Sequence, residues 1–194
     1  MTDSAVERAV LDADVLYRAA VRDILLQLAK DDLFEAKWTV QIHQEWMHAL
    51  RRNRPHIEWS RIERLRNKMD AETRDPLVFG YENLVEGLYL PEDPNDRHVL
   101  AAAIVGQCPI IVTINVGHFP AERLEPFGII AQHPDTFLQT LLDEERERFC
   151  AAIRTVRIRL KKPAYSVGAY LQNLADSGLV DTAEELRTYT HLLD

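Results

Sequence analysis

The chain has 194 residues and a formal net charge of −8, with 46% hydrophobic and 28% charged residues. This composition is ordinary for a soluble globular protein, and it provides enough apolar residues for a core. The negative charge argues against bulk adhesion to nucleic acid, although local basic runs can still contact phosphates.

The first 131 residues alternate short β-prone runs with helical patterns. The expected strands are residues 8–11, 38–41, 109–115 and 128–131, and the expected helices cover about 16–28, 42–50, 57–69 and 99–105. The run PIIVTIN at 109–115 suits a central parallel strand because it is continuously apolar and β-branched. This alternation predicts an α/β fold with a parallel central sheet flanked by helices.

From His133 onward the pattern is helical only. Helices are expected at about 137–159, 167–175 and 182–193, with a break at Lys162-Pro163 and a stop at Gly178. We expect Asp135, Ser166 and Asp181 to cap these helices. The predicted organisation is an α/β domain over 1–132 and an all-helical C-terminal subdomain over 133–194.

The segment PEDPNDRHVLAAAIVGQ, residues 91–107, crowds acids at the start of a helix. Asp93 suits the N-cap, Pro94 the first helical position, and Asp96 the first turn, where a carboxylate favours the helix dipole. Glu92 adds a third acid within five residues. Crowded carboxylates repel one another unless a cation lies among them, which indicates a metal site.

Further polar residues follow the predicted strands and complete a set. Asp12 ends the first strand, Glu45 lies on a helix, and Asn115 ends the central strand. In a parallel α/β sheet, ligands gather at the carboxyl ends of the strands, where Asp12 and Asn115 both fall.

In this order the residues resemble a PIN domain. The matching segments are VLDADVL, the helix glutamate, DPNDRHVLAAA and VTINVGHFP, which together cover roughly residues 6 to 138. The later leucine-rich helices are similar to the C-terminal extension of some VapC-type toxins of type II toxin–antitoxin pairs.

The resemblance implies a metal-dependent endoribonuclease that uses Mg²⁺ or Mn²⁺. Asp12 and Asp96 would be the main metal ligands, Glu45 would hold a second ion or orient the water, and Asn115 would support the site through its amide. The implied partners are an RNA substrate, a cognate antitoxin and a second copy in a homodimer.

His118 departs from the family pattern, which usually has Asp three residues after the Asn. The imidazole would either ligate a metal and shift the preference toward Mn²⁺ or another transition ion, or lie on a surface turn while Asp93 supplies the missing charge.

Simpler interpretations of the same residues stay open. Asp96 could be only a cap, Glu45 could be a solvated helix residue, and Asp14 is expected to be the N-cap of the first helix. Trp38, Trp46 and Trp59 are expected in the core.

Two basic runs stand out in this acidic chain. Residues 51–68 hold seven Lys or Arg against two acids, and residues 146–162 hold seven against one. They could contact RNA phosphates, form solvated helix faces, or dock an acidic antitoxin segment.

Two other functions compete with the nuclease. A degenerate module of the same fold could bind RNA or a protein without cleavage, with His118 as its support. A phosphatase of the haloacid dehalogenase type would use the D-x-D-x-V pattern at Asp12 and the strand ending at Thr113, but here the acids at 93 and 96 come before that strand.

Cys108 and Cys150 form no CxxC pair, so they fit neither a zinc ribbon nor a disulfide framework and are expected as reduced thiols. The stretch MTDSAVERAV lacks the regions of a secretory signal, and no apolar run approaches the roughly 18 residues of a membrane span. We therefore expect a cytoplasmic protein without a membrane partner.

Overall fold

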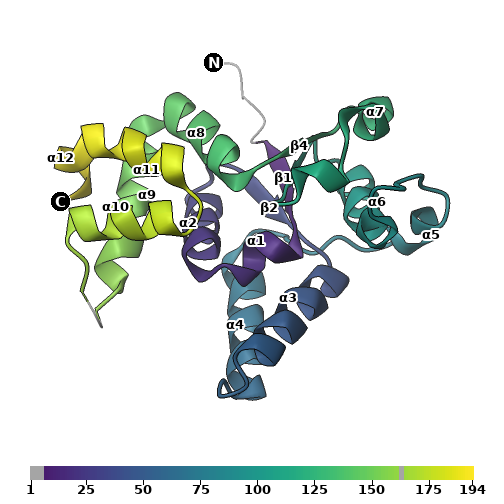
Figure 1. Ribbon diagram of the computed structural model, residues 1–194, viewed down its shortest axis with the longest axis horizontal. Coiled ribbons are helices and arrows are strands. Elements are labelled where there is room, and N and C mark those ends of the chain that lie inside the picture. The colour runs from purple at the N-terminus through teal and green to yellow at the C-terminus, as the bar shows by residue number, and fades with distance from the viewer. Residues whose placement is uncertain (1–6, 162–163) are drawn as a thin grey trace.

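A parallel four-stranded sheet forms the centre of the fold in the computed structural model, which describes residues 7–161 and 164–194 (Figure 1). The strands are β1 (Arg8–Leu11), β2 (Glu35–Lys37), β3 (Ile110–Val112) and β4 (Ile130–Gln132), in the order β2-β1-β3-β4. All three strand pairings are parallel. The predicted α/β class with a parallel sheet is confirmed.

β1 and β3 are the two central strands, and this placement follows from their side chains. Val10 lies opposite Ile111, and Leu11 lies opposite Val112. All four of these side chains are buried, because helices cover both faces of the sheet. Since β1 and β3 run parallel and in register, the residues that follow them meet at one edge.

The strand predicted at 38–41 was wrong. The second strand is β2, and Trp38 only makes an isolated bridge to Leu77. The reason is a helix cap: the Thr39 hydroxyl accepts a hydrogen bond from the Ile42 N–H at 3.0 Å, so α3 begins at Val40.

The helices of the first part surround the sheet. They are α1 (Ala13–Tyr17), α2 (Ala19–Lys30), α3 (Val40–Asn53), α4 (Trp59–Glu72), α5 (Glu82–Val85), α6 (Arg97–Val105) and α7 (Ala121–Leu124), with the short 3-10 turns η1 (Pro94–Asp96), η2 (Val116–His118) and η3 (Glu125–Phe127). The helix expected over 16–28 is two helices, which an extended Arg18 separates. In Figure 1, α3 and α4 extend away from the sheet as an antiparallel pair.

The C-terminal helices lie beside α2 (Figure 1). They are α8 (Pro134–Glu144), α9 (Arg146–Arg159), α10 (Val167–Asp176), α11 (Val180–Leu186), the 3-10 turn η4 (Arg187–Tyr189) and α12 (Thr190–Leu193). The helix predicted over 137–159 breaks at Glu145, which leaves helical geometry. The break predicted at Lys162-Pro163 lies outside the described residues.

The helix caps of this part differ partly from expectation. Ser166 caps α10 by accepting from the Ala169 N–H, as predicted. Asp135 does not cap its own helix, since His133 has that place. Its carboxylate instead accepts from the N–H groups of Asp181 and Thr182, both at 2.9 Å, and so caps α11. Asp181 lies in the first turn of α11 and is not its N-cap, contrary to the prediction.

One hydrophobic cluster contains side chains of the sheet, of α2 and of the C-terminal helices. The rings of Phe34 and Phe137 meet edge to face, with centroids 5.0 Å apart. Trp38 and Trp46 are fully buried in this core, as predicted, whereas Trp59 is half-buried. Cys108 and Cys150 are both buried free thiols. The domain boundary near residue 132 stays a prediction.

Within the described ranges, no helix combines the length and the apolar character that crossing a membrane would require.

Candidate metal centre

Asp12 lies at the carboxyl edge of the sheet, directly after β1. Its side chain is only 5% exposed. One carboxylate oxygen accepts from the Ala13 N–H at 2.6 Å, and the other accepts from the Thr113 hydroxyl, just beyond β3, at 2.8 Å. Asp12 is therefore held rigidly by groups from two neighbouring strands, which is the arrangement that the parallel sheet was expected to produce.

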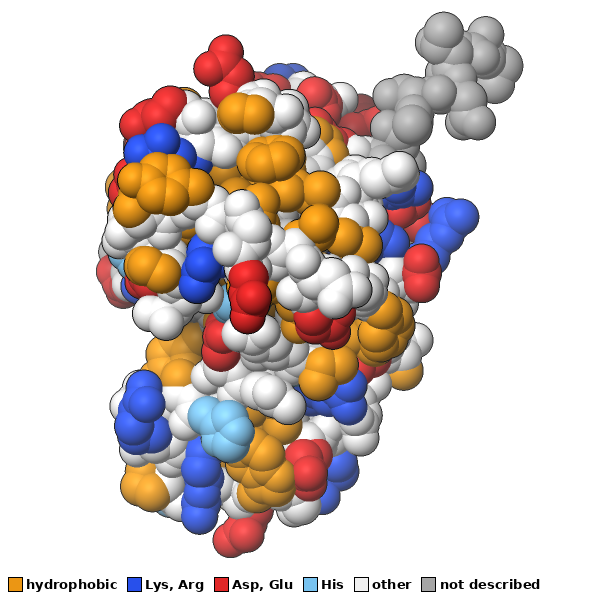
Figure 2. All heavy atoms as spheres, turned by 90° about the vertical axis from the view of Figure 1, so that its right-hand side faces the viewer, with side chains coloured by type: hydrophobic (Ala, Val, Ile, Leu, Met, Phe, Trp, Pro, Cys, Tyr) orange, Lys and Arg blue, Asp and Glu red, His pale blue; other side chains and the backbone are white. Residues whose placement is uncertain are grey.

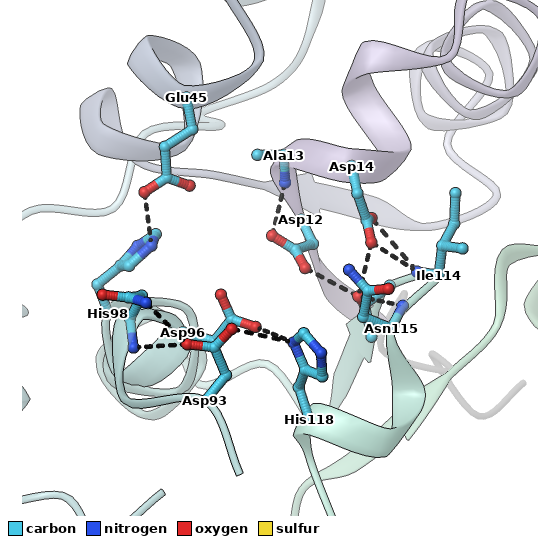
Figure 3. A network of polar contacts seen from close by, with 12 residues as sticks. Asp12, Ala13, Asp14, Glu45, Asp93, Asp96, His98, Ile114, Asn115 and His118 are labelled. Carbon is cyan, nitrogen blue, oxygen red and sulfur yellow. Dashed lines mark hydrogen bonds and ion pairs between the residues drawn. The ribbon is translucent and has the colours of Figure 1, made fainter. Parts of the chain in front are cut away.

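Asp14 belongs to the same cluster, contrary to the prediction that it would cap the first helix. The N-cap of α1 is Asp12. The Asp14 carboxylate points back to the end of β3, where it accepts from the Ile114 N–H at 3.1 Å and lies 3.3 Å from the Thr113 hydroxyl (Figure 3). The only sequence signal for this role was its position two residues after Asp12.

Asp93, Asp96 and His118 form a second group beside Asp12 (Figure 3). One ligand atom from each of the three lies within 4.8 Å of the others. The His118 Nδ1 is 2.8 Å from an Asp96 carboxylate oxygen and 3.5 Å from one of Asp93. His118 is thus near the carboxylates, as the ligand interpretation requires, and Asp93 is there too, as the alternative requires.

Asp93 combines capping with a place in this group, because its two oxygens have different partners. One accepts from the Asn95 backbone N–H at 2.9 Å, which confirms the predicted N-cap at the start of η1. The other faces His118. Asp96 makes no capping hydrogen bond for α6, and its carboxylate instead forms a hydrogen bond with the His118 ring.

Glu45 reaches the site from α3 and is paired there with a histidine that the sequence did not single out. Its carboxylate lies 2.9 Å from the Nε2 of His98, on α6 (Figure 3). The His98 side chain is 2% exposed, and its Nδ1 has no hydrogen-bond partner among the described residues. A histidine just after Asp96 at the start of an apolar helix was the available signal. The pair fixes one carboxylate oxygen of Glu45, while the Glu45 side chain as a whole is 40% exposed.

Asn115 follows β3 at the edge of the cluster and is exposed. Its backbone N–H donates to the Thr113 hydroxyl at 3.1 Å, and its side chain lies near Asp14 in Figure 3.

The crowding of acids changes their proton affinity. Burial, together with the nearby charge of Asp14, raises the pKa of Asp12 to about 7. Burial also raises the pKa of Asp14 and of Asp96. The hydrogen bond to Asp96 raises the pKa of His118. Each acid holds its proton more tightly mainly because it is buried, and the negative charge of its neighbours adds to this effect; a cation among them would oppose it.

The donor set fits a hard divalent cation. Carboxylate oxygens are the ligands that Mg²⁺ and Mn²⁺ prefer, and a single imidazole is compatible with Mn²⁺. Asp12 and Asp14 come from the junction of β1 and α1, Asp96 comes from the end of η1, and the two segments converge on one edge of the sheet. Their raised pKa values record an electrostatic cost that a bound cation would offset.

Comparison with known proteins gives two family matches. Residues 8–117 match the model of the PIN domain, and residues 134–188 match that of the VapC50 C-terminal domain. A curated protein of Mycobacterium tuberculosis (strain ATCC 25618 / H37Rv), named "Putative ribonuclease VapC50", is 44% identical over 76 residues, which are 39% of this chain and 44% of that protein. The matched region thus spans less than half of the relative. No solved structure matches the chain significantly.

Proposed function

Because the chain belongs to the PIN domain family, we propose that it is a divalent-metal-dependent endoribonuclease and the toxin of a toxin–antitoxin pair. The observation that carries the proposal is the convergence of Asp12, Asp14, Asp93 and Asp96 at the carboxyl edge of a parallel sheet. The resemblance of the helical extension to the VapC50 C-terminal domain supports the toxin part. RNA is the substrate in this proposal, and a cognate antitoxin and a second copy of the chain are the protein partners.

Asp12 and Asp96 would hold Mg²⁺ or Mn²⁺, with Asp14 and Asp93 adding negative charge beside them. The bound cation supplies positive charge for phosphate oxygens and makes coordinated water more acidic. Thr113 keeps Asp12 and Asp14 in place through its hydroxyl.

Glu45 would orient the attacking water or accept its proton, because His98 fixes one of its carboxylate oxygens and the side chain remains partly exposed to solvent. Asn115 would support the site through its amide, as the family pattern implies. A scissile phosphodiester placed between Glu45 and the aspartates would lie within reach of both the general base and the bound cation.

A second candidate is a module of this fold that binds RNA or a protein without cleaving. The contact between His118 and Asp96 favours it, because an imidazolium there satisfies a carboxylate that would otherwise bind metal.

Expression of the chain without an antitoxin tests the proposal. Growth should stop with the wild type, and should continue with Asp12→Ala or Asp96→Ala, because each change removes a metal ligand. Asp143→Ala serves as the matched control, since Asp143 is an exposed acid on α8 far along the chain from the cluster, and it should still arrest growth.

Both site variants must keep the wild-type circular dichroism and a cooperative thermal transition. Arrest that persists in folded Asp12→Ala and Asp96→Ala would refute a nuclease centred on these residues. RNA binding by the purified protein without any cleavage in Mg²⁺ or Mn²⁺ would favour the non-cleaving module.

A further inference from the structure

Both basic runs of the sequence reach one groove, which lies between the α3–α4 pair and the C-terminal helices α9 and α10. The groove encloses about 1750 Å³ and ends at Asp14 and Glu45 of the candidate metal centre. The residues that line it come mainly from α1, α2, α3, α4, α9 and α10, which can be followed in Figure 1. We propose that single-stranded RNA binds in this groove, held jointly by Arg61 and Arg64 of α4 and by Arg159 and Lys161 of the C-terminal extension.

This proposal rests on the proposed function, because the groove leads the strand to the carboxylates. It adds that the C-terminal helices are part of the RNA site rather than a separate attachment. Within the groove wall, eight Lys or Arg residues accompany four acids, two of which are Asp14 and Glu45 themselves. The wall is therefore locally positive in a chain of net charge −8.

The cations that face the groove differ from other basic residues in their partners. Arg61, Arg64, Arg159 and Lys161 are exposed and form no ion pair with any described residue. Four other arginines of the second basic run are engaged elsewhere. Arg146 lies over the Tyr189 ring, Arg148 donates to the Asp31 carbonyl, and Arg154 and Arg157 donate to carbonyls of the C-terminal residues Asp194 and Leu193. Only cations without such partners are free for phosphates.

A buried hydroxyl in the groove wall also lacks a partner. Tyr170, on α10, is 2% exposed, and its hydroxyl forms no hydrogen bond with any described group. A buried phenol normally finds a partner, so a polar group of a ligand or an ordered water belongs there. Tyr17 and Tyr165 line the same groove and are half-buried, which leaves part of each ring to the groove.

Single-stranded RNA fits this combination better than an acidic peptide. Proteins that bind single strands pair a positive groove with aromatic side chains on which bases stack. An acidic peptide would bring its carboxylates to the end that already holds Asp14 and Glu45, where they would repel. RNA brings a phosphodiester to that end, which is the group that a metal centre cleaves.

The surface on the opposite side of α3 is different in character. Figure 2 shows hydrophobic side chains gathered on the upper part of the face that α5–α7 form, with acidic side chains below them. The exposed apolar residues in and around α5 and α6 include Phe79, Leu84, Tyr89 and Val105. On α6 and α7, Arg97 donates to the Pro94 carbonyl, and Arg123 pairs with Glu92 and lies over the Tyr89 ring, so we place the RNA path on the α4–α10 side.

Binding without cleavage tests the groove separately from the nuclease. The probe is a fluorescein-labelled, 20-nucleotide single-stranded RNA of random sequence, measured by fluorescence anisotropy in chelator at 0.1 M salt. Two double variants, Arg61→Ala/Arg64→Ala and Arg159→Ala/Lys161→Ala, each remove two cations. For a single strand, each phosphate contact makes the logarithm of the binding constant fall with the logarithm of the salt concentration with a slope of about −0.7. One contact therefore adds about fivefold to the affinity at 0.1 M salt compared with 1 M salt.

Each double variant should therefore weaken binding by about 25-fold and reduce the salt slope by about 1.4. The matched control is Arg52→Ala/Arg74→Ala, because both residues are exposed, form no ion pair with a described residue and do not line the groove. The control should stay within about twofold of the wild type. Thermal transitions of all variants should match, since the changed side chains are exposed.

If only the α4 variant weakens binding, the C-terminal helices do not belong to the site and the joint groove is refuted. Unchanged binding in both double variants, with RNA still cleaved in Mg²⁺ or Mn²⁺, refutes the groove and leaves the nuclease standing. Weakened binding in both, with no cleavage by the wild type, supports the groove and refutes the nuclease. The assignment to single strands is overturned if duplex RNA displaces the labelled probe as well as unlabelled single-stranded RNA does. It is also overturned if the two double variants lose binding of polyglutamate but keep binding of RNA.

Discussion

Replacement of Asp12 by Asn should stabilise the metal-free protein above pH 7. The Asp12 carboxyl is 5% exposed, and burial with the charge of Asp14 raises its pKa from 3.8 to about 7. The folded state therefore holds this proton between about pH 4 and pH 7, where the unfolded chain has lost it. Stability contributed by the neutral form is present below the unfolded pKa and is lost as pH rises through about 7.

The size of the effect follows from the shift. Three pKa units correspond to about 4 kcal/mol at high pH. Ala13 and Thr113 donate to different oxygens of the Asp12 carboxylate, and Asn keeps only one of these oxygens, so it gives up one hydrogen bond of about 1 kcal/mol. A net gain of about 2–3 kcal/mol raises Tm by roughly 5–10 °C for a chain of this size.

Urea and thermal unfolding in chelator at pH 5 and pH 8 measure this effect. Asp12→Asn should be clearly more stable than the wild type at pH 8, and the difference in stability should be much smaller at pH 5. Asp143 is an exposed acid, so Asp143→Asn should have the stability of the wild type at both pH values. Metal at 100 times its Kd should then stabilise the wild type by about 2.7 kcal/mol and the variant far less. An Asp12→Asn protein that is no more stable than the wild type at pH 8 would refute the electrostatic account of the site.

Three further outcomes follow from the same contacts. His118→Asp should raise Mg²⁺-dependent cleavage by about tenfold in an Mg²⁺ titration, because it adds an anionic ligand; unchanged metal affinity and rate would defeat the idea that position 118 ligates. Asp135→Ala should lower the free energy of urea unfolding by about 2–4 kcal/mol, since two N–H groups at the start of α11 lose their acceptor, and a loss below about 1 kcal/mol would contradict this role. His98→Ala should reduce the cleavage rate about tenfold by freeing Glu45, and His98→Gln, which keeps a donor, should lose less; equal rates in both variants would show that the pair does not position Glu45.

The sheet could be predicted because its information is local. The continuous apolar runs at β1 and β3 can only be buried between two layers of helices, and the alternation with helices leaves parallel pairing as the solution. β2 was misplaced because the short β-prone run at residues 38–41 resembles a strand, whereas the Thr39 cap starts a helix there. Trp38 is buried, as predicted, although it makes only an isolated bridge and belongs to no strand.

The structure brings together most of the carboxylates that the sequence singled out, and their role as a metal site stays a prediction. The sequence missed the residues that hold these carboxylates in place. Asp12 and Asp96 were identifiable because strand ends and helix starts can be recognised in the sequence. Asp14 was misassigned because its hydrogen bonds run to residues about 100 positions later in the chain, at Ile114 and Thr113. His98 was missed because its partner Glu45 lies on another helix.

The C-terminal helices show the same limit. Asp135 sits in the first turn of α8, where an acid suits the dipole, so the sequence favoured a local role. The structure places its carboxylate under the start of α11 instead. Only the three-dimensional packing of α8 against α11 determines that choice.

RNA cleavage by the wild type and by Asp96→Asn, each in Mg²⁺, in Mn²⁺ and in chelator, tests the central claim most directly. Asn at this position removes the charge of the carboxylate beside His118 while keeping its shape. The wild type should cleave single-stranded RNA with either metal and not in chelator, and Asp96→Asn should be at least 100-fold slower with both metals. Cleavage by the wild type that persists in chelator, or an Asp96→Asn rate equal to that of the wild type, would contradict a metal-dependent ribonuclease built on this cluster.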